Sequence, residues 1–414
     1  MKRLLWLAIL LALTGCHRPP ADDKIHLEFW TMSLEKFEPY IRSRMEAFEA
    51  THPEVKLEWI DLPLQAAQQK LMAGIAAGEP PDLVNLNTEF ALVLAQNQAL
   101  VSMTEAVPPE TQQLYFPGLW QAAEFEGEVY AIPWYVTTRV VMYNKRIFAE
   151  AGLDPDKPPT DWDELARDAR QVHARTKYVG YMPAIKIVND WTMWKVPVVD
   201  YSDLTARFNS PQGVARLDWY RQMFLDGVIP PEALTDGYRG ALDRYKAGSL
   251  ALLEAGPQLL LELKADAPGV YANTGVAPLP ASPSGEVPAA TMNFVVPRSA
   301  RHRQLAVEFG LFLTSPDNQL AFDKLVPILP STRATAEDPF FQTGSGEPLL
   351  DQAIRISIDQ LNRARDFSLG LPKQRDLNRA LKENVEAALS GKLSSQEALD
   401  RAARRWNEIL AAYR

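Results

Sequence analysis

Residues 128–152, EVYAIPWYVTTRVVMYNKRIFAEAG, place groups that can bind another molecule at the mouth of an apolar strand. Trp134, Tyr135, Thr138 and Arg139 stand where a plain core strand would carry aliphatic side chains. Binding pockets combine apolar and aromatic surface with a few convergent polar groups. This stretch therefore predicts one wall of a binding cleft.

No pattern of a catalytic or metal centre accompanies it. The sequence contains none of the motifs HExxH, GxSxG or GxxxxGK[ST]. The histidines lack the paired spacing of metal ligands: they are His17, His26, His52, His173 and His302. Carboxylates are plentiful, but a sequence does not show which two would face each other across a glycosidic bond. We therefore predict a binding protein with no cofactor and no metal, and not an enzyme.

The first residues have the anatomy of an export signal. Lys2 and Arg3 give a positive start, 4–13 is a short apolar run, and LTGC ends it. That run is too short to span a membrane. LTGC resembles a bacterial lipobox, which implies that Cys16, the only cysteine, becomes the lipidated first residue of the mature chain. The sequence thus predicts a signal peptide over 1–15, a tether over 16–24 and a body held to the membrane by its lipid anchor only.

Length and charge narrow the class of protein further. A chain of 414 residues, 47% apolar and 23% charged, predicts two globular lobes and not a disordered protein. The formal charge is −9, and it becomes −11 once Lys2 and Arg3 leave with the signal peptide. An acidic body disfavours nucleic acid and anionic lipid surfaces as partners.

Strands and helices alternate along the first part of the chain. Strand patterns at 25–30, 55–62 and 81–87 are each followed by a helical pattern, which predicts an α/β lobe. The second of these helices is expected to end at Gly78. Further predictions are a hairpin turn at Glu126-Gly127, a short helix ending at Gly152, a capping box from Thr160 to Asp163, and strands at 140–143, 178–184, 250–256 and 291–297.

The opening stretch and the residues after it resemble a segment of the extracellular solute-binding proteins of family 1, the maltose-binding-like receptors of ABC importers. The shared order is a strand with proline, a polar turn, an arginine, Tyr-Asn-Lys, a short helix ending Ala-Gly-Leu, and then Pro-Pro, Thr, Trp and Glu-Leu. Further similar pieces follow the family's order over nearly the whole mature chain: FWTM, AGIAAGEPPDLVNLN, YKAGSLALLEAGP, TMNFVVP and TSPDNQLAF with VPILPSTRAT.

This resemblance implies a two-lobed periplasmic-binding-protein fold of type II, with several hinge crossings between α/β lobes. The N-terminal lobe would comprise 25–133 and 293–340, and the C-terminal lobe 134–290 and 341–414. The implied protein is a monomer that captures a sugar or oligosaccharide by hinge closure and delivers it to ABC permease subunits. It would be anchored in the periplasm, at the outer face of the cytoplasmic membrane. Aromatic faces suit the C–H surface of a sugar, and polar side chains satisfy its hydroxyls.

Other candidate contacts follow strands or lie in polar segments. Trp30 and Asn87 end strands at the carboxyl edge, where open α/β sheets bind ligands, although Asn87 could instead cap a helix. The resemblance implies stacking aromatics in NDWTMWK, but Trp191 and Trp194 could also pack as one helix face. Arg139 is either a ligand contact or a partner in a hinge ion pair.

Three later residues complete the candidate set. Gly256 offers close approach of the backbone to a ligand, or merely a turn before Pro257. Asn293 lies on the return crossing, and Arg365 falls in a region where the resemblance implies late cleft contacts. Trp162, by contrast, matches the family's helix-packing tryptophan and is expected in the core.

Other readings of the sequence stay open. WTMW has the spacing of an aromatic pair in receptors for glycerophosphodiesters, and Arg139 or Arg365 could meet a phosphate bidentately. A lipid-anchored carbohydrate hydrolase would need a carboxylate pair at hydrolytic separation. A scaffold that binds a protein partner would show an exposed apolar patch and no enclosed pocket.

Overall fold

The computed structural model describes residues 23–344 and 346–414. The predicted signal peptide, Cys16 and most of the predicted tether lie outside the described residues. Within them, no helix is long and apolar enough to cross a membrane.

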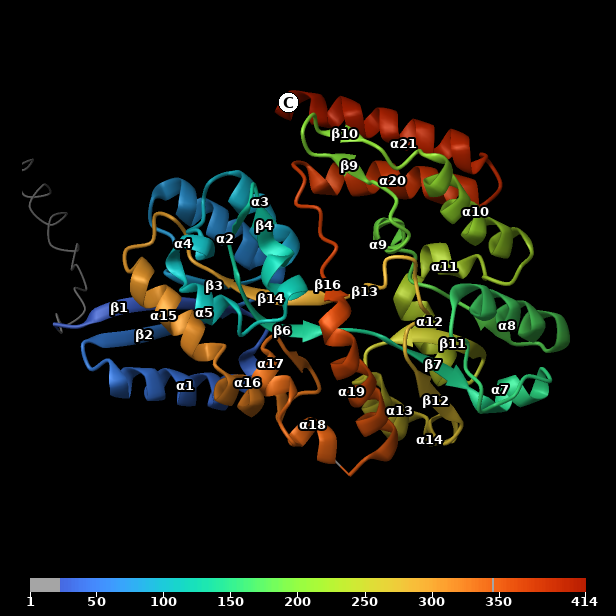
Figure 1. Ribbon diagram of the computed structural model, residues 1–414, viewed down its shortest axis with the longest axis horizontal. Helices are drawn as coiled ribbons and strands as arrows, with labels where there is room; N and C mark the ends of the chain where they lie inside the picture. The colour runs from blue at the N-terminus through green and yellow to red at the C-terminus, as the bar shows by residue number, and fades with distance from the viewer. Residues whose placement is uncertain (1–22, 345) are drawn as a thin grey trace, which may run out of the picture.

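The first lobe is built on a six-stranded sheet (Figure 1). Strand β1, next to the edge strand β2, pairs in parallel with β2 and β3, while β14 runs antiparallel to both β3 and β6. In the order of the sheet, the strands are β15 (Leu329–Pro330), β6 (Ile132–Thr137), β14 (Ala290–Val295), β3 (Leu83–Asn87), β1 (Ile25–Met32) and β2 (Val55–Leu62).

Alternation along β1 sends side chains into two cores, one on each face of this sheet. Leu27 and Phe29 pack in one core, with helices α1 and α15, and Trp30 and Met32 pack in the other, with α2 and α3. The helices of this lobe include α1 (Glu38–Thr51), α2 (Leu64–Ala77), α3 (Thr88–Gln96), α4 (Met103–Ala106), α5 (Pro109–Gln112), α6 (Pro117–Trp120), α15 (Arg303–Leu313), α16 (Pro316–Asp323) and α17 (Arg333–Ala336).

The second lobe is built on a four-stranded sheet. In this sheet β7 runs antiparallel to β11 and to β12, and β8 runs parallel to β11. The strands, in sheet order, are β12 (Thr274–Ala277), β7 (Val140–Asn144), β11 (Leu250–Ala255) and β8 (Val179–Tyr181). Helices that pack around it are α7 (Lys145–Glu150), α8 (Trp162–Arg175), α12 (Gly237–Lys246), α13 (Leu259–Asp266) and α19 (Pro348–Gln360).

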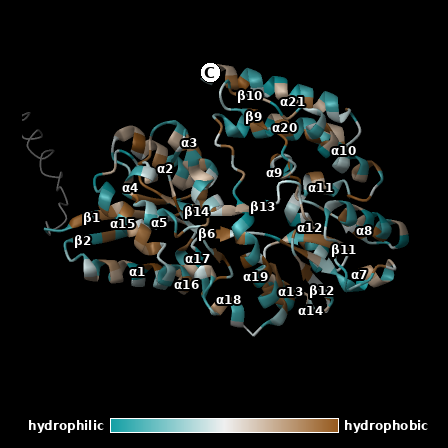
Figure 2. Ribbon diagram, viewed as in Figure 1, coloured by the Kyte–Doolittle hydropathy of each residue, from teal (hydrophilic) through white to brown (hydrophobic). Residues whose placement is uncertain are grey.

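A further group of helices extends the second lobe beyond this sheet. In Figure 1 the long helices α20 and α21 lie along the top of the lobe, with α10 against them. Like α8, α21 carries both hydrophilic and hydrophobic residues, as expected for a helix with one face on a core (Figure 2). The group comprises α9 (Ile187–Met193), α10 (Pro211–Leu225), α11 (Glu232–Thr235), α20 (Gln374–Leu389) and α21 (Ser395–Leu410).

The chain passes between the lobes at several points, as the sequence predicts. Strand β6 belongs to the first sheet and β7 to the second, so only Thr138 and Arg139 separate the lobes there. The return passes through β13 (Val287–Pro288), which pairs with β16 (Ala364–Arg365), before β14 begins. A later passage runs from α18 (Phe340–Thr343) to α19. Residue 133, after which the sequence predicts the lobe boundary, lies inside β6.

Most of the predicted local signals are confirmed, and one is shifted by a residue. Gly78 and Gly152 follow helices with φ of 75° and 73°, and the hairpin turns at Glu126-Gly127 between β4 (Glu124–Phe125) and β5 (Glu128–Val129). The capping box predicted from Thr160 to Asp163 is wrong. Asp161 is the cap of α8, because its carboxylate accepts the backbone N–H of Glu164 at 2.8 Å, while Thr160 donates to the Glu164 carboxylate.

Candidate functional site

Two adjoining cavities lie where the lobes meet. An outer cavity of about 840 Å³ takes wall residues from both lobes, and an inner one of about 220 Å³ continues it toward the second sheet. The two share residues of the β6 end, of the segment before α9 and of the segment before β14. They therefore form one cleft with a wide outer part and a narrow inner end.

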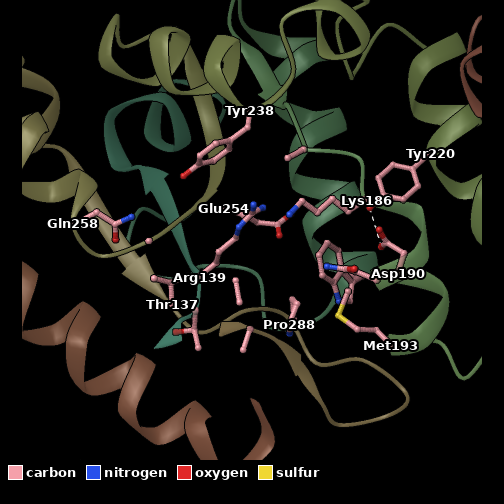
Figure 3. Close-up of a pocket in the computed structure, with 17 residues that line it drawn as sticks. Thr137, Arg139, Lys186, Asp190, Met193, Tyr220, Tyr238, Glu254, Gln258 and Pro288 are labelled. Atoms are coloured by element: carbon pink, nitrogen blue, oxygen red, sulfur yellow. Dashed lines mark hydrogen bonds between the residues drawn. The ribbon is translucent and has the colours of Figure 1, made fainter. Parts of the chain in front are cut away.

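The inner cavity is built at the carboxyl end of β6 and the end of β11. Thr137 ends β6, and Arg139 reaches from the crossing toward the middle of the cavity beside Lys186 and Glu254 (Figure 3). Gln360 fixes the crossing, because its amide donates to the backbone carbonyl of Arg139 at 3.2 Å. The guanidinium of Arg139 lies 4.9 Å from the centre of the Tyr238 ring, which is a cation–π distance.

A buried ion pair forms one side of this inner cavity. Asp190 Oδ1 accepts from Arg216 Nη2 at 2.6 Å, from Arg216 Nε at 3.2 Å and from the Tyr220 hydroxyl at 2.9 Å. The guanidinium lies 3.6 Å from the Trp194 ring centre and 4.2 Å from that of Trp219. The pair thus fixes the Asp190 carboxylate while its second oxygen, Oδ2, has no hydrogen-bond partner among the described residues.

The other charged groups of the inner cavity are less fully paired. Glu254 accepts a hydrogen bond from the Tyr181 hydroxyl, and desolvation raises the pKa of its carboxyl although the charge of Arg139 acts in the opposite direction. Desolvation in the cleft, and next the charge of Arg139, lower the pKa of Lys186. Neither Arg139 nor Lys186 forms an ion pair or donates a side-chain hydrogen bond to the described part of the protein.

Several neutral hydrogen-bonding groups face the same space. The amides of Asn189 and Gln258 line the inner cavity and have no hydrogen-bond partner in the described chain. Two buried groups at its wall, Thr138 Oγ1 and Trp162 Nε1, also lack partners. Buried polar groups are normally hydrogen-bonded, so this concentration of unused groups points to a polar ligand.

The outer cavity combines polar groups near the crossing strands with an apolar wall. Asn87 lines it and also caps α3, since its side chain accepts the backbone N–H of Phe90 at 3.0 Å. Tyr135 contributes a ring from the first lobe, and burial raises the pKa of its hydroxyl to about 12. The apolar wall comes from the second lobe and includes Leu234, Leu381, Val385 and Leu389.

No metal-binding arrangement accompanies the cleft. Within 23–344 and 346–414, no group of three or more His, Cys, Asp or Glu side chains could hold an ion. What the cleft offers is hydrogen bonds and charge to a solute.

Comparison with known proteins identifies the family. A profile of the bacterial extracellular solute-binding proteins matches residues 33–320. The chain belongs to this family. Family membership and the mixed α/β fold confirm the receptor class and the two-lobed fold predicted from the sequence.

Individual relatives match over nearly their whole length. The sn-glycerol-3-phosphate-binding periplasmic protein UgpB of Escherichia coli strain K12 is 24% identical over 100% of this chain and 99% of its own. A structure from Synechococcus sp. MITs9220, described as that of an oligosaccharide periplasmic-binding protein, is 32% identical with a TM-score of 0.82, over 94% of this chain and 99% of that one. The sugar-binding protein MalE of Xanthomonas citri is 24% identical with a TM-score of 0.79, over 94% of this chain and 98% of that one; this likeness shows the fold.

The structure brings part of the predicted residue set to the cleft. The residues that line it are Asn87, Tyr135, Thr138, Arg139 and Gly256. The remaining candidates lie outside both cavities: Trp30, Trp134, Trp191, Trp194, Asn293 and Arg365. The sequence left open whether Arg139 contacts the ligand or forms an ion pair at the hinge. In the described part of the chain its side chain forms no ion pair.

Two of the tryptophans that were predicted to face the cleft pack inside the lobes. Trp134 is fully buried and stacks on Phe294 at 4.6 Å and on Phe322 at 5.1 Å. Trp191 is also fully buried, 4.7 Å from Phe208, and its indole donates to a backbone carbonyl. Their placement corrects the expectation that these two rings face the cleft, because a fully buried ring has no surface for a solute in this conformation.

The other four candidates have partners of their own. Trp30 donates to Glu28 at 2.5 Å and packs in the second core of the first lobe, and Trp194 covers Arg216. Asn293 is fully buried at the crossing, where its amide donates to Thr88 Oγ1 at 3.1 Å. Arg365 pairs with Glu286 at 3.0 Å on the surface. In this conformation none of the four lines either cavity, contrary to the expected cleft position.

Sequence reasoning also missed residues that the structure brings to the cleft. Trp162 was expected only to pack, yet its ring lines the inner cavity beside Lys186 and Asp190. Glu254 carried a usable signal, because it is a lone acid in the apolar strand LALLEAG. Tyr238 carried none, since it lies near the start of an ordinary amphipathic helix. The missed residues of the inner cavity include Trp162, Lys186, Asn189, Asp190, Tyr238, Glu254 and Gln258.

Proposed function

We propose that the chain is the substrate-binding lipoprotein of an ABC importer and that it captures a sugar or oligosaccharide in the cleft between its lobes. The observation that carries the proposal is the inner cavity, whose hydrogen-bonding side chains lack partners in the described protein. Relatives named for sugars and for an oligosaccharide share its fold, which supports this class of solute.

The chemistry of the cleft suits a polyhydroxylated solute. The amides of Asn189 and Gln258 can each donate and accept, and the free oxygens of Asp190 and Glu254 can accept from hydroxyls. The Tyr135 and Tyr238 rings offer apolar faces for the C–H surface of a sugar. An outer cavity of about 840 Å³ leaves room for more than one ring.

Both lobes contribute to the outer cavity, which supports capture by closure. Asn87 and Tyr135 come from the first lobe, whereas Lys186, Asn189 and Tyr238 come from the second. A solute held by both sets stabilises the closed arrangement, because only that arrangement allows all the contacts at once. Exchange between open and closed lobes at Thr138–Arg139 and at the return strand is the motion we expect.

The family and the first residues support anchoring to the membrane and delivery of the solute to a permease. Cys16 would hold the mature monomer by a lipid to the outer face of the cytoplasmic membrane. Permease subunits and an ATPase would take the solute across the membrane. The paired Asp190, fixed by Arg216, favours a binding role over that of a hydrolytic acid.

The proposal is tested by isothermal titration of the mature chain with mono- and oligosaccharides, followed by analysis of the recovered sugar. We expect one sugar to bind and to be recovered intact. Asn189→Ala should weaken that binding about tenfold, the loss of one to two hydrogen bonds. Gln113→Ala, at an exposed position away from the cleft, should not change it. A recovered sugar that has been cleaved would support the hydrolase instead, and a panel without any binding sugar would contradict the proposal.

A further inference from the structure

The inner end of the cleft carries two cations that the protein leaves without anionic partners. Arg139 and Lys186 reach into the same part of the inner cavity (Figure 3). In the described ranges neither forms an ion pair or donates a side-chain hydrogen bond. Other cations of the second lobe do have such partners, as Arg207 has with Asp200 and Asp203.

The nearby carboxylates do not cancel this positive charge. Asp190 is already neutralised by Arg216, whose Nη2 lies 2.6 Å from it, and both side chains are buried. Glu254 is the remaining acid of the inner cavity, so two unpaired cations face one carboxylate. Burial also raises the pKa of Glu254, which reduces its negative charge relative to an exposed glutamate.

Acids of the outer cavity lie on the other side of Lys186. Asp366 accepts hydrogen bonds from the backbone N–H groups of Thr291 and Ser368, so it is engaged in holding the turn after β16 against β14. Glu89 lines the outer cavity at the start of α3, where desolvation and the charge of Asp366 raise its pKa while Lys186 acts in the opposite direction. Positive charge is therefore concentrated at the inner end of the cleft and negative charge at its outer part.

Neutral groups around the two cations add donors. Trp162 Nε1 can only donate, and it lacks a partner at the cavity wall. The amides of Asn189 and Gln258 add N–H groups to the same space. The cavity of about 220 Å³ is several times the roughly 30 Å³ that a water molecule occupies in the liquid, so a phosphate or carboxylate group fits.

We infer that Arg139 and Lys186 form a subsite for an anionic group of the solute, a phosphate or a carboxylate, with the rest of the solute in the outer cavity. This inference rests on the proposed function, and it narrows the solute from any sugar to an acidic or phosphorylated sugar or polyol. Arg139 supplies a planar fork that can bind such an oxyanion bidentately, and Lys186 supplies a compact charge.

The test compares neutral compounds with their anionic counterparts by isothermal titration of the mature chain. The pairs are glycerol with sn-glycerol 3-phosphate, and glucose with glucose 6-phosphate and with glucuronate. We expect at least one anionic compound to bind about tenfold or more tightly than its neutral counterpart. Its affinity should fall as sodium chloride is raised. Comparison of the affinities for glucose 6-phosphate and for glucuronate shows whether the subsite prefers a phosphate or a carboxylate.

Variants show whether the two cations carry this preference. Arg139→Gln and Lys186→Gln should each lower the affinity for the anionic compound about tenfold or more and leave the affinity for the neutral compound nearly unchanged. Lys186→Arg, which keeps the charge, should retain most of the affinity. Arg301→Gln and Lys157→Gln, at exposed positions away from the cleft, are the matched controls. The melting temperature of each variant checks folding, and Lys186 is exposed, so its replacement should not unfold the lobe.

The outcomes separate the subsite from the proposed function. The subsite is overturned if neutral sugars bind as tightly as the anionic compounds. It is also overturned if neither Arg139→Gln nor Lys186→Gln changes the affinity for the anionic compound. In both cases the protein remains a sugar receptor. Failure of every anionic compound overturns the subsite as well. If no neutral sugar or oligosaccharide binds while an anionic compound binds through Arg139 and Lys186, the subsite is supported and the proposal of a neutral sugar as the solute is contradicted.

Discussion

Replacing Asp190 by asparagine tests how the wall of the inner cavity is held. The change leaves the Arg216 guanidinium buried without its counter-ion, and breaking a buried ion pair from one side destabilises a protein by about 3–5 kcal/mol. The asparagine carbonyl can still accept from Arg216, and the rings of Trp194 and Trp219 keep their cation–π contact. We therefore expect the lower end of this range, a loss of about 3 kcal/mol.

The assay is urea unfolding followed by tryptophan fluorescence, which reports on the second lobe through the indoles around Arg216. An exposed pair supplies the reference: Arg207→Gln breaks the contacts to Asp200 and Asp203 and should cost less than about 1 kcal/mol. If Asp190→Asn costs no more than Arg207→Gln, the buried pair does not hold the wall and the reasoning is refuted.

A double variant distinguishes the effect of losing the ion pair on stability from the effect of leaving one buried charge unpaired. Asp190→Asn combined with Arg216→Met removes both charges, and apolar replacement of a buried pair is often neutral. We expect the double variant to recover a large part of the stability that Asp190→Asn loses. It should not recover solute binding, because the carboxylate at the cavity wall is gone. Equal stability of the single and double variants would contradict this division.

Three further changes test separate parts of the structure. Trp134→Ala should lower the free energy of unfolding by about 3–5 kcal/mol in urea and leave solute affinity within about twofold, since the ring packs in the core and not in the cleft; a tenfold affinity loss in a folded variant would contradict its placement. Asp161→Ala should cost about 1 kcal/mol, and Asp163→Ala less than about 0.5 kcal/mol, because only Asp161 caps α8; thermal unfolding checks this order. The folded-state pKa of Glu254 is raised, so its contribution to stability is complete below the unfolded pKa of about 4.3 and is lost as pH rises through the folded pKa. Glu254→Gln should therefore gain stability relative to the wild type as pH rises above about 4, and a difference in urea stability that stays flat with pH would count against it.

The elements could be predicted because their signals are local. Periodicity places β1, β2 and β3 and the helices between them, and glycines at positive φ mark helix ends at Gly78 and Gly152. The capping box shows the limit of this reasoning. Thr160 and Asp161 are both good caps, and the choice between them depends on where the preceding loop delivers the chain, which no local pattern states.

The aromatic contacts could not be predicted because their partners are distant in sequence. Trp134 is fixed by Phe294 and Phe322, which reach it through β14 and α16. The pair in WTMW has the spacing of a binding pair, yet Trp194 stacks on Arg216 of α10. An aromatic ring at the right spacing therefore says nothing of whether a solute or the protein's own side chain will cover it.

The polar part of the cleft follows a different logic. A core strand excludes acids because an unpaired charge is expensive to bury, so Glu254 in LALLEAG already indicates a function at that position. Its hydrogen bond to Tyr181 shows how the strand tolerates it, and its side chain lines the inner cavity. Arg139 gave the same kind of signal at the crossing. Charges in or next to apolar strands are therefore better indicators of this cleft than the tryptophans are, because a buried ring is stable without a ligand, whereas an unpaired charge is far less so.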